Sequence, residues 1–457
     1  MGGGMQRQSM QMGHRRARWA AGLIALAALP ACLGYAGPAD APPPQTRVME
    51  PTERPTPPPS RSAGRLAYVG LDGNVWVTSP DQGEPSQVTD DATAPPEGQG
   101  RSYHRVAWLR DGSLAFAAVT RTQDDAWSEL YVKPALDEPA ELVAENDDHF
   151  VIYVYGAPAC PNDDARCPAL AYMIEEPNGV GLHLIYTDGA SGDGVRDVLV
   201  AVGRPFYVSW APEGGQLLWH TGGALRENPA AELGLYDVQT DGRQVLPHAP
   251  GAFRAPAWRP RGDAWLAVVE AEGDDHLLRS ARGESARLLQ TSGAGTAFVW
   301  SPDGSRVAYA ERAWPGAEFY SPVWLLDPVS GERRQLTDDA FNVLGFFWSP
   351  DGRKLAYLSR LDLPNEVWMQ WRVFDTELGR DRGYTAFLPS PLMHFVIHSF
   401  DQYAQSHRFW SPDGRYLVYA ERDDQETDRV RLVEVEAERG ADPILVDEGS
   451  MGVWSWE

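Results

Sequence analysis

The amino-acid sequence predicts an all-β protein, a β-propeller of eight four-stranded blades. The first observation is a motif, W-S-P-D-G, that recurs at Trp300, Trp348 and Trp410. Its spacings of 48 and 62 residues suit a repeated supersecondary unit and are too long for a coiled-coil heptad. The second observation is that four short apolar segments alternate with Gly, Pro and Asp between the motifs. That pattern is typical of one propeller blade per repeat.

Degenerate copies of the motif extend the repeat toward the N-terminus. Their anchors are Trp108, Trp210 and Trp258, and a further unit fits if Tyr155 takes the tryptophan position and the loop after it is an insertion. A partial unit at Trp454 ends the chain. We therefore expect eight blades, or seven if the unit at Tyr155 is not a full blade.

The two ends of the repeat region complement each other. The segment that begins at residue 64, GRLAYVGLDGNVWVTSP, matches the second strand of a blade and has no Trp strand before it. Residues 451–457, MGVWSWE, match a Trp strand with nothing after it. We expect these segments to pair and close the ring, because an open ring leaves sheet edges exposed to aggregation.

The motif has the chemistry of a hairpin turn. Its proline sets φ near −65°, its aspartate can bond its own backbone, and its glycine takes the left-handed conformation that a tight reversal needs. The acids of the three perfect copies, Asp303, Asp351 and Asp413, are therefore expected to be structural.

Residues 1–31 have the order of a secretory signal. Arg15, Arg16 and Arg18 precede an uncharged run that is too short to span a bilayer. The run is followed by LPAC, which ends at Cys32 and resembles the lipobox of bacterial lipoproteins, apart from its proline. In that class the cysteine becomes a lipid-modified N-terminus, so the resemblance implies a membrane anchor. The alternative is an ordinary signal with a chance cysteine.

The cysteine count agrees with lipidation at Cys32. The other two cysteines are Cys160 and Cys167, and an exported protein rarely keeps an orphan thiol. If Cys32 carries lipid, we expect Cys160 and Cys167 to form a disulfide in an oxidising compartment. A disulfide to another chain would equally leave no cysteine unpaired.

Residues 32–63 are predicted to be a linker. They contain nine prolines between Ala36 and Ala63 and no apolar periodicity, so they cannot bury enough surface to fold alone. A proline-rich spacer extends by about 3.1 Å per residue and would hold the propeller of residues 64–457 away from a membrane.

The charge balance argues against nucleic acid as a partner. The chain has 40 basic and 64 acidic residues, a net charge of −24, and removal of residues 1–31 with their four arginines makes it −28. An acidic surface repels phosphate backbones and anionic polysaccharides. Solubility is the main role we assign to this charge.

The repeats W-S-P-D-G-x-x-[LIV]-[AV]-Y, over residues 64–457, resemble those of TolB-like, WD-repeat-related propellers of bacterial envelopes. Related propellers are binding platforms, non-catalytic halves of peptidases and, rarely, lyases. The chain departs from TolB itself, a soluble periplasmic protein whose propeller follows an α/β domain, because residues 32–63 leave no room for such a domain.

Two functions follow as expectations. The first is a lipid-anchored, extracytoplasmic binding or scaffold module for a protein, peptide or glycan of the bacterial envelope. For this module we predict no catalytic residue, metal or cofactor, since the chain lacks the nucleophile elbow G-x-S-x-G. The second is a metal-dependent enzyme acting on polysaccharide, with the histidine-rich segment 394–407 as its site.

The histidine-rich segment lies between the seventh and eighth units. Imidazoles and a carboxylate within 14 residues can bind a ligand or a transition metal. Alternatively, the first two histidines lie in or beside an inner strand and are structural. The candidates are His394, His398, Asp401, Tyr403 and His407.

Four aromatic residues are further ligand-binding candidates. We expect them on long connections between the second and third strands of blades, where exposed aromatics commonly anchor recognition. The alternative is that they cap the apolar ends of the blades. These residues are Trp127, Trp314, Phe319 and Tyr320.

Overall fold

The computed structural model describes residues 62–457, with gaps at residues 97, 148, 159–166, 177, 188–193, 223–230, 293–294, 315 and 364–365. The predicted signal, Cys32 and most of the linker lie outside the described residues, and so does Cys160. The lipid anchor and the disulfide therefore remain predictions. Within the described ranges, no helix has the length and apolarity needed to cross a bilayer.

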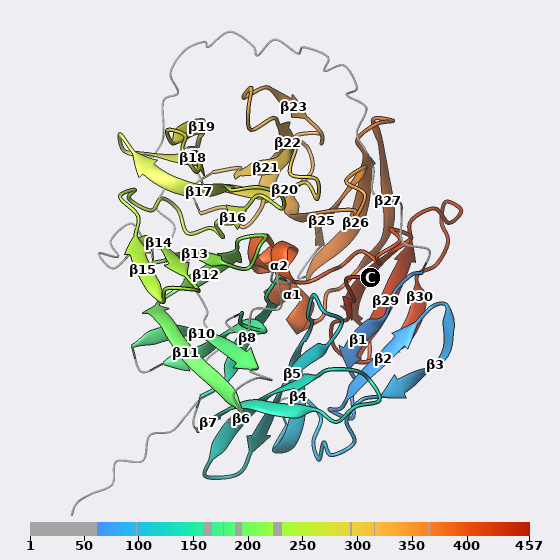
Figure 1. The fold of residues 1–457 in the computed structure, drawn as a ribbon. Helices are drawn as coiled ribbons and strands as arrows, with labels where there is room; N and C mark the ends of the chain where they lie inside the picture. Colours follow the sequence, from blue (N-terminus) through green and yellow to red (C-terminus); the bar gives the residue numbers. More distant parts are fainter. Residues whose placement is uncertain are drawn as a thin grey trace, which may run out of the picture. The chain divides into compact units, whose positions relative to one another are not determined.

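The described strands form antiparallel sheets, most of them four-stranded, that follow one another in chain order around two short helices (Figure 1). The first four sheets contain β3 (Gln82–Gln87), β2 (Val75–Ser79), β1 (Leu66–Val69) and β31 (Val453–Trp454); β4 (Gly100–Trp108), β5 (Leu114–Arg121), β6 (Ala126–Lys133) and β7 (Glu141–Asp147); β8 (Val151–Gly156), β9 (Leu170–Glu176), β10 (Gly179–Thr187) and β11 (Val195–Gly203); and β12 (Phe206–Trp210), β13 (Gln216–Thr221), β14 (Glu232–Asp237) and β15 (Gly242–Val245).

The remaining sheets complete the series. Two four-stranded groups are joined into one sheet by a single pair, Tyr320 opposite Val343. The strands are β16 (Ala257–Trp258), β17 (Ala264–Ala271), β18 (Asp274–Ala281) and β19 (Arg287–Ser292); β20 (Thr296–Trp300), β21 (Val307–Arg312), β22 (Tyr320–Leu326) and β23 (Arg333–Gln335); β24 (Val343–Trp348), β25 (Lys354–Leu363), β26 (Glu366–Asp375) and β27 (Arg380–Phe387); and β28 (Tyr416–Arg422), β29 (Asp428–Glu434) and β30 (Ile444–Glu448).

The two ends of the repeat region pair as their sequences predicted. Strand β31 runs antiparallel to β1, with Leu66 opposite Trp454 and Ala67 opposite Val453. The side chain of Ser455 adds a hydrogen bond, because its Oγ accepts from the Arg65 amide at 2.9 Å. Residues from the two ends of the propeller sequence therefore share one sheet.

The W-S-P-D-G turns have the predicted chemistry. In the copy at Trp300, Asp303 Oδ1 accepts from the Ser301 hydroxyl at 2.6 Å and from the Ser305 amide at 3.0 Å. Gly304 has φ of 68°, a value that a side chain would disfavour. The same pattern surrounds Asp351 and Asp413, so all three acids are structural.

Four of the motif tryptophans tie neighbouring repeats together. Each donates its indole N–H, at 3.1 to 3.3 Å, to the carbonyl of the residue just before the tryptophan of the preceding repeat, and for Trp108 the preceding repeat is the C-terminal one. The pairs are Trp108 with Val453, Trp300 with Ala257, Trp348 with Val299, and Trp410 with Phe347. These motif tryptophans therefore fill the apolar core and also link neighbouring repeats by hydrogen bonds.

His394 and His398 do not lie in an inner strand, but in a helix that packs against the inner strand β24. Residues 391–406 form α1 (Pro391–His398) and α2 (Phe400–Ser406). Helix α1 begins where the Ser390 hydroxyl accepts from the Met393 amide and Pro391 starts the first turn, which are both strong helix-start signals. Its buried residues recur with helical spacing, at Met393, Val396 and Ile397.

Candidate functional site

Helix α2 is held among the inner strands by side-chain amides. It contacts β8, β12, β20 and β24. Gln402, which is buried, accepts from the Val208 amide and donates to the Val208 carbonyl, both at 2.8 Å. It also donates to the hydroxyl of Tyr153 at 2.8 Å. One side chain therefore satisfies backbone groups of β12 that another strand would normally satisfy.

The other polar residues of α2 form similar contacts. Asp401 Oδ2 accepts from the Ala255 amide at 2.9 Å. Gln405 Oε1 accepts from the Ser209 hydroxyl at 2.6 Å, and Gln405 Nε2 donates to the Pro256 carbonyl at 3.0 Å. The predicted site residue Asp401 thus helps to anchor the helix.

The remaining candidates of the histidine-rich segment do not form one cluster. His394 and His398 are exposed on α1. Tyr403 is buried on α2, and its ring lies 4.9 Å from the ring of His407. Burial and the nearby Arg105 lower the pKa of His407 to about 3, so its ring is neutral near pH 7. In the described part of the chain, no group of three or more His, Cys, Asp and Glu residues could hold a metal ion.

The four aromatic candidates also differ in their surroundings. Trp314 is 55% exposed and packs edge-to-face against Phe319 at 5.1 Å. Tyr320 is buried, since it begins β22 and packs against Phe400 of α2, so its predicted exposure is wrong. Trp127 is half-buried within β6 rather than on a connection. Of the four candidates, only Trp314 and Phe319 lie where they were expected, on the connection between β21 and β22.

A cavity of about 540 Å³ lies at the turn ends of the inner strands, with Ala404 and Gln405 of α2 in its wall. The motif supplies most of its apolar surface, because the tryptophan and the proline of several repeats line it. The tryptophans are Trp210, Trp258, Trp300, Trp348, Trp410 and, from the C-terminal segment, Trp456. The prolines are Pro212, Pro260, Pro302 and Pro350.

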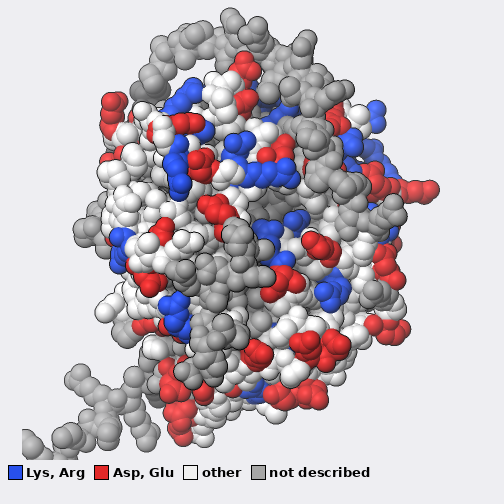
Figure 2. Space-filling model, viewed as in Figure 1, with Lys and Arg blue, Asp and Glu red and all other residues white. Residues whose placement is uncertain are grey.

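The charged part of this wall is basic. Its lining residues include Arg110, Arg259 and Arg408, and none of the described lining residues is acidic. On the face seen in Figure 2, by comparison, acidic and basic side chains are intermixed. In a chain with a net charge of −24, this cavity is therefore a local region of positive charge.

Of the residues that the sequence offered as ligand-binding candidates, His407 alone lines this cavity, and the exposed aromatic pair lies elsewhere. Trp314 follows β21, so it lies at the opposite end of that strand from the motif turn at residues 301–306. A signal was present in two degenerate motifs. W-L-R-D-G has Arg110 in the proline position, and W-R-P-R-G has Arg259 in the serine position. Neither change is needed for a hairpin.

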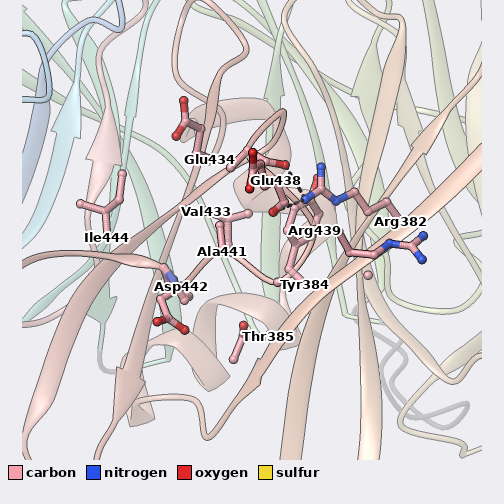
Figure 3. A pocket seen from close by; sticks show the side chains of 14 residues that line it. Arg382, Tyr384, Thr385, Val433, Glu434, Glu438, Arg439, Ala441, Asp442 and Ile444 are labelled. Atoms are coloured by element: carbon pink, nitrogen blue, oxygen red, sulfur yellow. Dashed lines mark hydrogen bonds between the residues drawn. The ribbon is translucent and has the colours of Figure 1, made fainter.

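A second, smaller pocket of about 290 Å³ lies between β27 and the loop after β29 (Figure 3). Arg382 extends along it and donates to the backbone carbonyls of Val435, Ala437 and Glu438 at 3.0, 2.7 and 3.0 Å. The Tyr384 hydroxyl also donates to the Val435 carbonyl, at 2.8 Å. The guanidinium of Arg382 is thus engaged in fixing the loop.

Comparisons with known proteins identify the fold. No protein-family model and no curated protein sequence matches the chain. Dipeptidyl peptidase 4 from Porphyromonas gingivalis is similar over 85% of this chain and 60% of its own, at 12% identity and a TM-score of 0.50. The chain therefore spans less than two thirds of that protein.

Two further solved structures are similar at low identity. TolB from Acinetobacter baumannii matches 74% of this chain and 81% of its own at 16% identity, with a TM-score of 0.37. Oligogalacturonate lyase from Vibrio parahaemolyticus matches 81% of this chain and 96% of its own at 13% identity, with a TM-score of 0.46. At such low identities these similarities concern the fold alone. The fold is that of a β-propeller, a series of antiparallel sheets.

Proposed function

We propose that this chain is a binding module that receives its ligand in the cavity at the motif-turn end of the propeller. The observation that carries the proposal is the cavity itself. It is concave, its wall is mostly aromatic and proline side chains, and its few charged groups are of one sign. Small-molecule and chain-end ligands are usually bound in such cavities, with apolar walls and a few orienting polar groups.

The composition of the wall favours binding over catalysis. General acid–base chemistry commonly needs a proton acceptor and a proton donor at the reacting atoms. The described wall has no carboxylate and no thiol, and the Nδ1 atom of His407 lies 2.7 Å from the Ser406 hydroxyl. The alternative of a metal-dependent enzyme acting on polysaccharide has no supporting cluster among the described residues.

The proposal includes a closed ring of eight blades, carried on a membrane. Pairing of β31 with β1 supports closure, and the series of sheets supports eight units. Lipid on Cys32 and the linker of residues 32–63 would present the propeller on the extracytoplasmic side of a bacterial membrane. Its partner there would be a protein, peptide or glycan of the envelope, and nucleic acid would be excluded by charge.

Filling the cavity tests the binding function. Ala404 lines the cavity on α2, so Ala404→Phe would occupy the space that a ligand needs. Ala286→Phe, on the exposed loop between β18 and β19, is the matched control. The full-length protein is cross-linked in envelope membranes, and its bound components are identified by mass spectrometry. We expect a component that the control retains and Ala404→Phe loses; an identical set for both variants would exclude the cavity as the binding site.

Replacing the lipobox cysteine tests the anchor. We expect Cys32→Ser to move the protein from the membrane fraction to the soluble fraction, because acyl chains contribute about 0.8 kcal/mol per buried CH₂. Fractionation after a salt wash measures this change. Continued sedimentation of the variant with membranes would show that Cys32 does not anchor the chain.

A further inference from the structure

Two arginines from distant parts of the chain share one aromatic ring in the cavity. The guanidinium carbon of Arg110 lies 3.2 Å from the ring centroid of Trp456, and that of Arg408 lies 4.4 Å from it. Arg110 belongs to the turn after β4, and Arg408 precedes the motif tryptophan Trp410. Two positive charges are therefore close neighbours at the wall of a cavity.

Among the described residues, no acidic group compensates these charges. Neither Arg110 nor Arg408 forms an ion pair with any of them, and Nε of Arg408 is buried without a hydrogen-bond partner. Burial, and then repulsion from Arg110, lower the pKa of Arg408 to about 9. A buried guanidinium nitrogen without a partner, next to a second cation, is an unfavourable arrangement.

We propose that this pair of arginines binds the carboxylate of a ligand whose remainder is apolar. The inference rests on the proposed function, since it names the chemistry of the ligand in the same cavity. A guanidinium binds a carboxylate through two parallel N–H···O bonds, so an incoming carboxylate would supply the missing partner.

The rest of the cavity wall favours a ligand whose uncharged part is apolar. Its polar groups near α2 are already engaged, since the Ser209 hydroxyl donates to Gln405 Oε1 and accepts from the Trp258 amide at 3.0 Å. A sugar would bring hydroxyl groups that find few partners there, and each buried hydroxyl without a partner is unfavourable. Indole and proline surfaces instead favour an aromatic or aliphatic body.

Calorimetric titration of the full-length protein with four probes tests the inference. The probes are N-acetyl-phenylalanine, which mimics the end of a peptide, 3-phenylpropionate, a free apolar acid, N-acetyl-phenylalanine amide, which lacks the charge, and inorganic phosphate. We expect at least one of the two carboxylates to bind, and the amide and phosphate to bind at least about tenfold more weakly, because charge-assisted hydrogen bonds contribute about 1.5–3 kcal/mol.

Variants identify the groups responsible. Arg110→Gln should weaken carboxylate binding by about tenfold or more, whereas Arg282→Gln, at an exposed arginine outside the cavity, should leave it unchanged. Thermal unfolding of both variants checks that they are folded. Because Arg110 is accessible to water within the cavity, its replacement should not disturb the core.

The outcomes separate this inference from the proposed function. Preference for N-acetyl-phenylalanine would identify a peptide chain end as the source of the carboxylate, and preference for 3-phenylpropionate a free acid; both support the inference. Equal binding of acid and amide, equal binding of phosphate, or no effect of Arg110→Gln would overturn it. If none of the probes binds while Ala404→Phe still abolishes an envelope contact, the cavity binds a different chemistry and only this inference falls.

Discussion

Trp258 and Trp300 occupy the same position in neighbouring repeats but differ by one hydrogen bond. Trp300 donates to the Ala257 carbonyl at 3.1 Å, whereas Nε1 of Trp258 is buried without a partner. Both rings are more than nine-tenths buried. The pair therefore allows the hydrogen bond between repeats to be measured apart from the burial of the ring.

We expect Trp300→Phe to destabilise the protein more than Trp258→Phe does. Both changes shrink a buried ring, but only the first removes a hydrogen bond to a buried carbonyl, which contributes about 0.5–1.5 kcal/mol. Chemical denaturation of both variants gives the difference. Equal losses of unfolding free energy would mean that the indole N–H contributes nothing to the contact between repeats.

His183 has an environment that stabilises its charged form. Burial alone would lower its pKa, but hydrogen bonds with Asp197 (Nδ1 at 2.9 Å) and Glu176 (Nε2 at 3.3 Å) outweigh burial and raise it above 6.5. The folded protein therefore binds this proton more tightly than the unfolded chain. The resulting stabilisation is fully present below about pH 6.5 and is lost as the pH rises through the folded-state pKa.

Replacement of His183 should remove part of the pH dependence of stability. We expect His183→Gln to lose more unfolding free energy at pH 5.5 than at pH 8.5. The control, His248→Gln in the loop after β15, should leave the pH dependence of the unfolding free energy unchanged. Thermal unfolding across this range measures the effect. A parallel loss at all pH values would show that the imidazolium and the two carboxylates do not interact.

At the scale of elements, helix α2 takes the place that a neighbouring strand would have beside β12. The side-chain amide of Gln402 makes the hydrogen bonds that such a strand would make. The Val208 amide and carbonyl both bond to Gln402, although the helix approaches β12 from a distant part of the sequence. A buried backbone group without a partner is costly, so this contact fixes the helix as well as the strand. The sequence places this segment between the seventh and eighth units but does not predict a helix there, because its seven residues carry no strong helical pattern.

We expect Gln402→Leu to destabilise the protein by about 2–5 kcal/mol. The substitution keeps the volume but leaves the Val208 N–H and C=O groups unsatisfied. Gln425→Leu, at an exposed turn position, is the control and should change stability by less than about 0.5 kcal/mol. Urea denaturation compares the two, and similar unfolding free energies would mean that α2 does not depend on this amide.

At the scale of the whole molecule, the last seven residues join the two ends of the folded region. Trp454 is buried beside β1, and Trp456 donates to the Trp108 carbonyl at 2.8 Å. The Val453 carbonyl in turn accepts from Trp108 at 3.2 Å. These bonds connect the C-terminal segment to both the first and the second sheet.

We expect a chain that ends at Ser450 to unfold several degrees below the full chain. Truncating one buried aromatic costs about 3–5 kcal/mol, and this deletion also removes the partner of β1. Glu457→Gln, which leaves the paired residues in place, is the control. A shift in unfolding temperature of only about a degree would contradict a closed ring.

The sequence by itself determined the strands, the hairpin turns and the pairing of the chain ends. These features are local or repeated, so the backbone preferences of proline and glycine and the hydrogen bonds of Asp303 and its equivalents predict them in every copy. Periodicity also revealed which strand lacked a partner at each end.

Only the tertiary structure decided where a ligand can bind. Arg110 and Arg408 are about 300 residues apart in the sequence, and they meet at Trp456 because the first and last parts of the folded region pack together. Likewise, the burial of Tyr320 and the helical state of His394 and His398 depend on packing against distant strands. Such contacts have no local signature, because residues that form them need no common pattern in the chain.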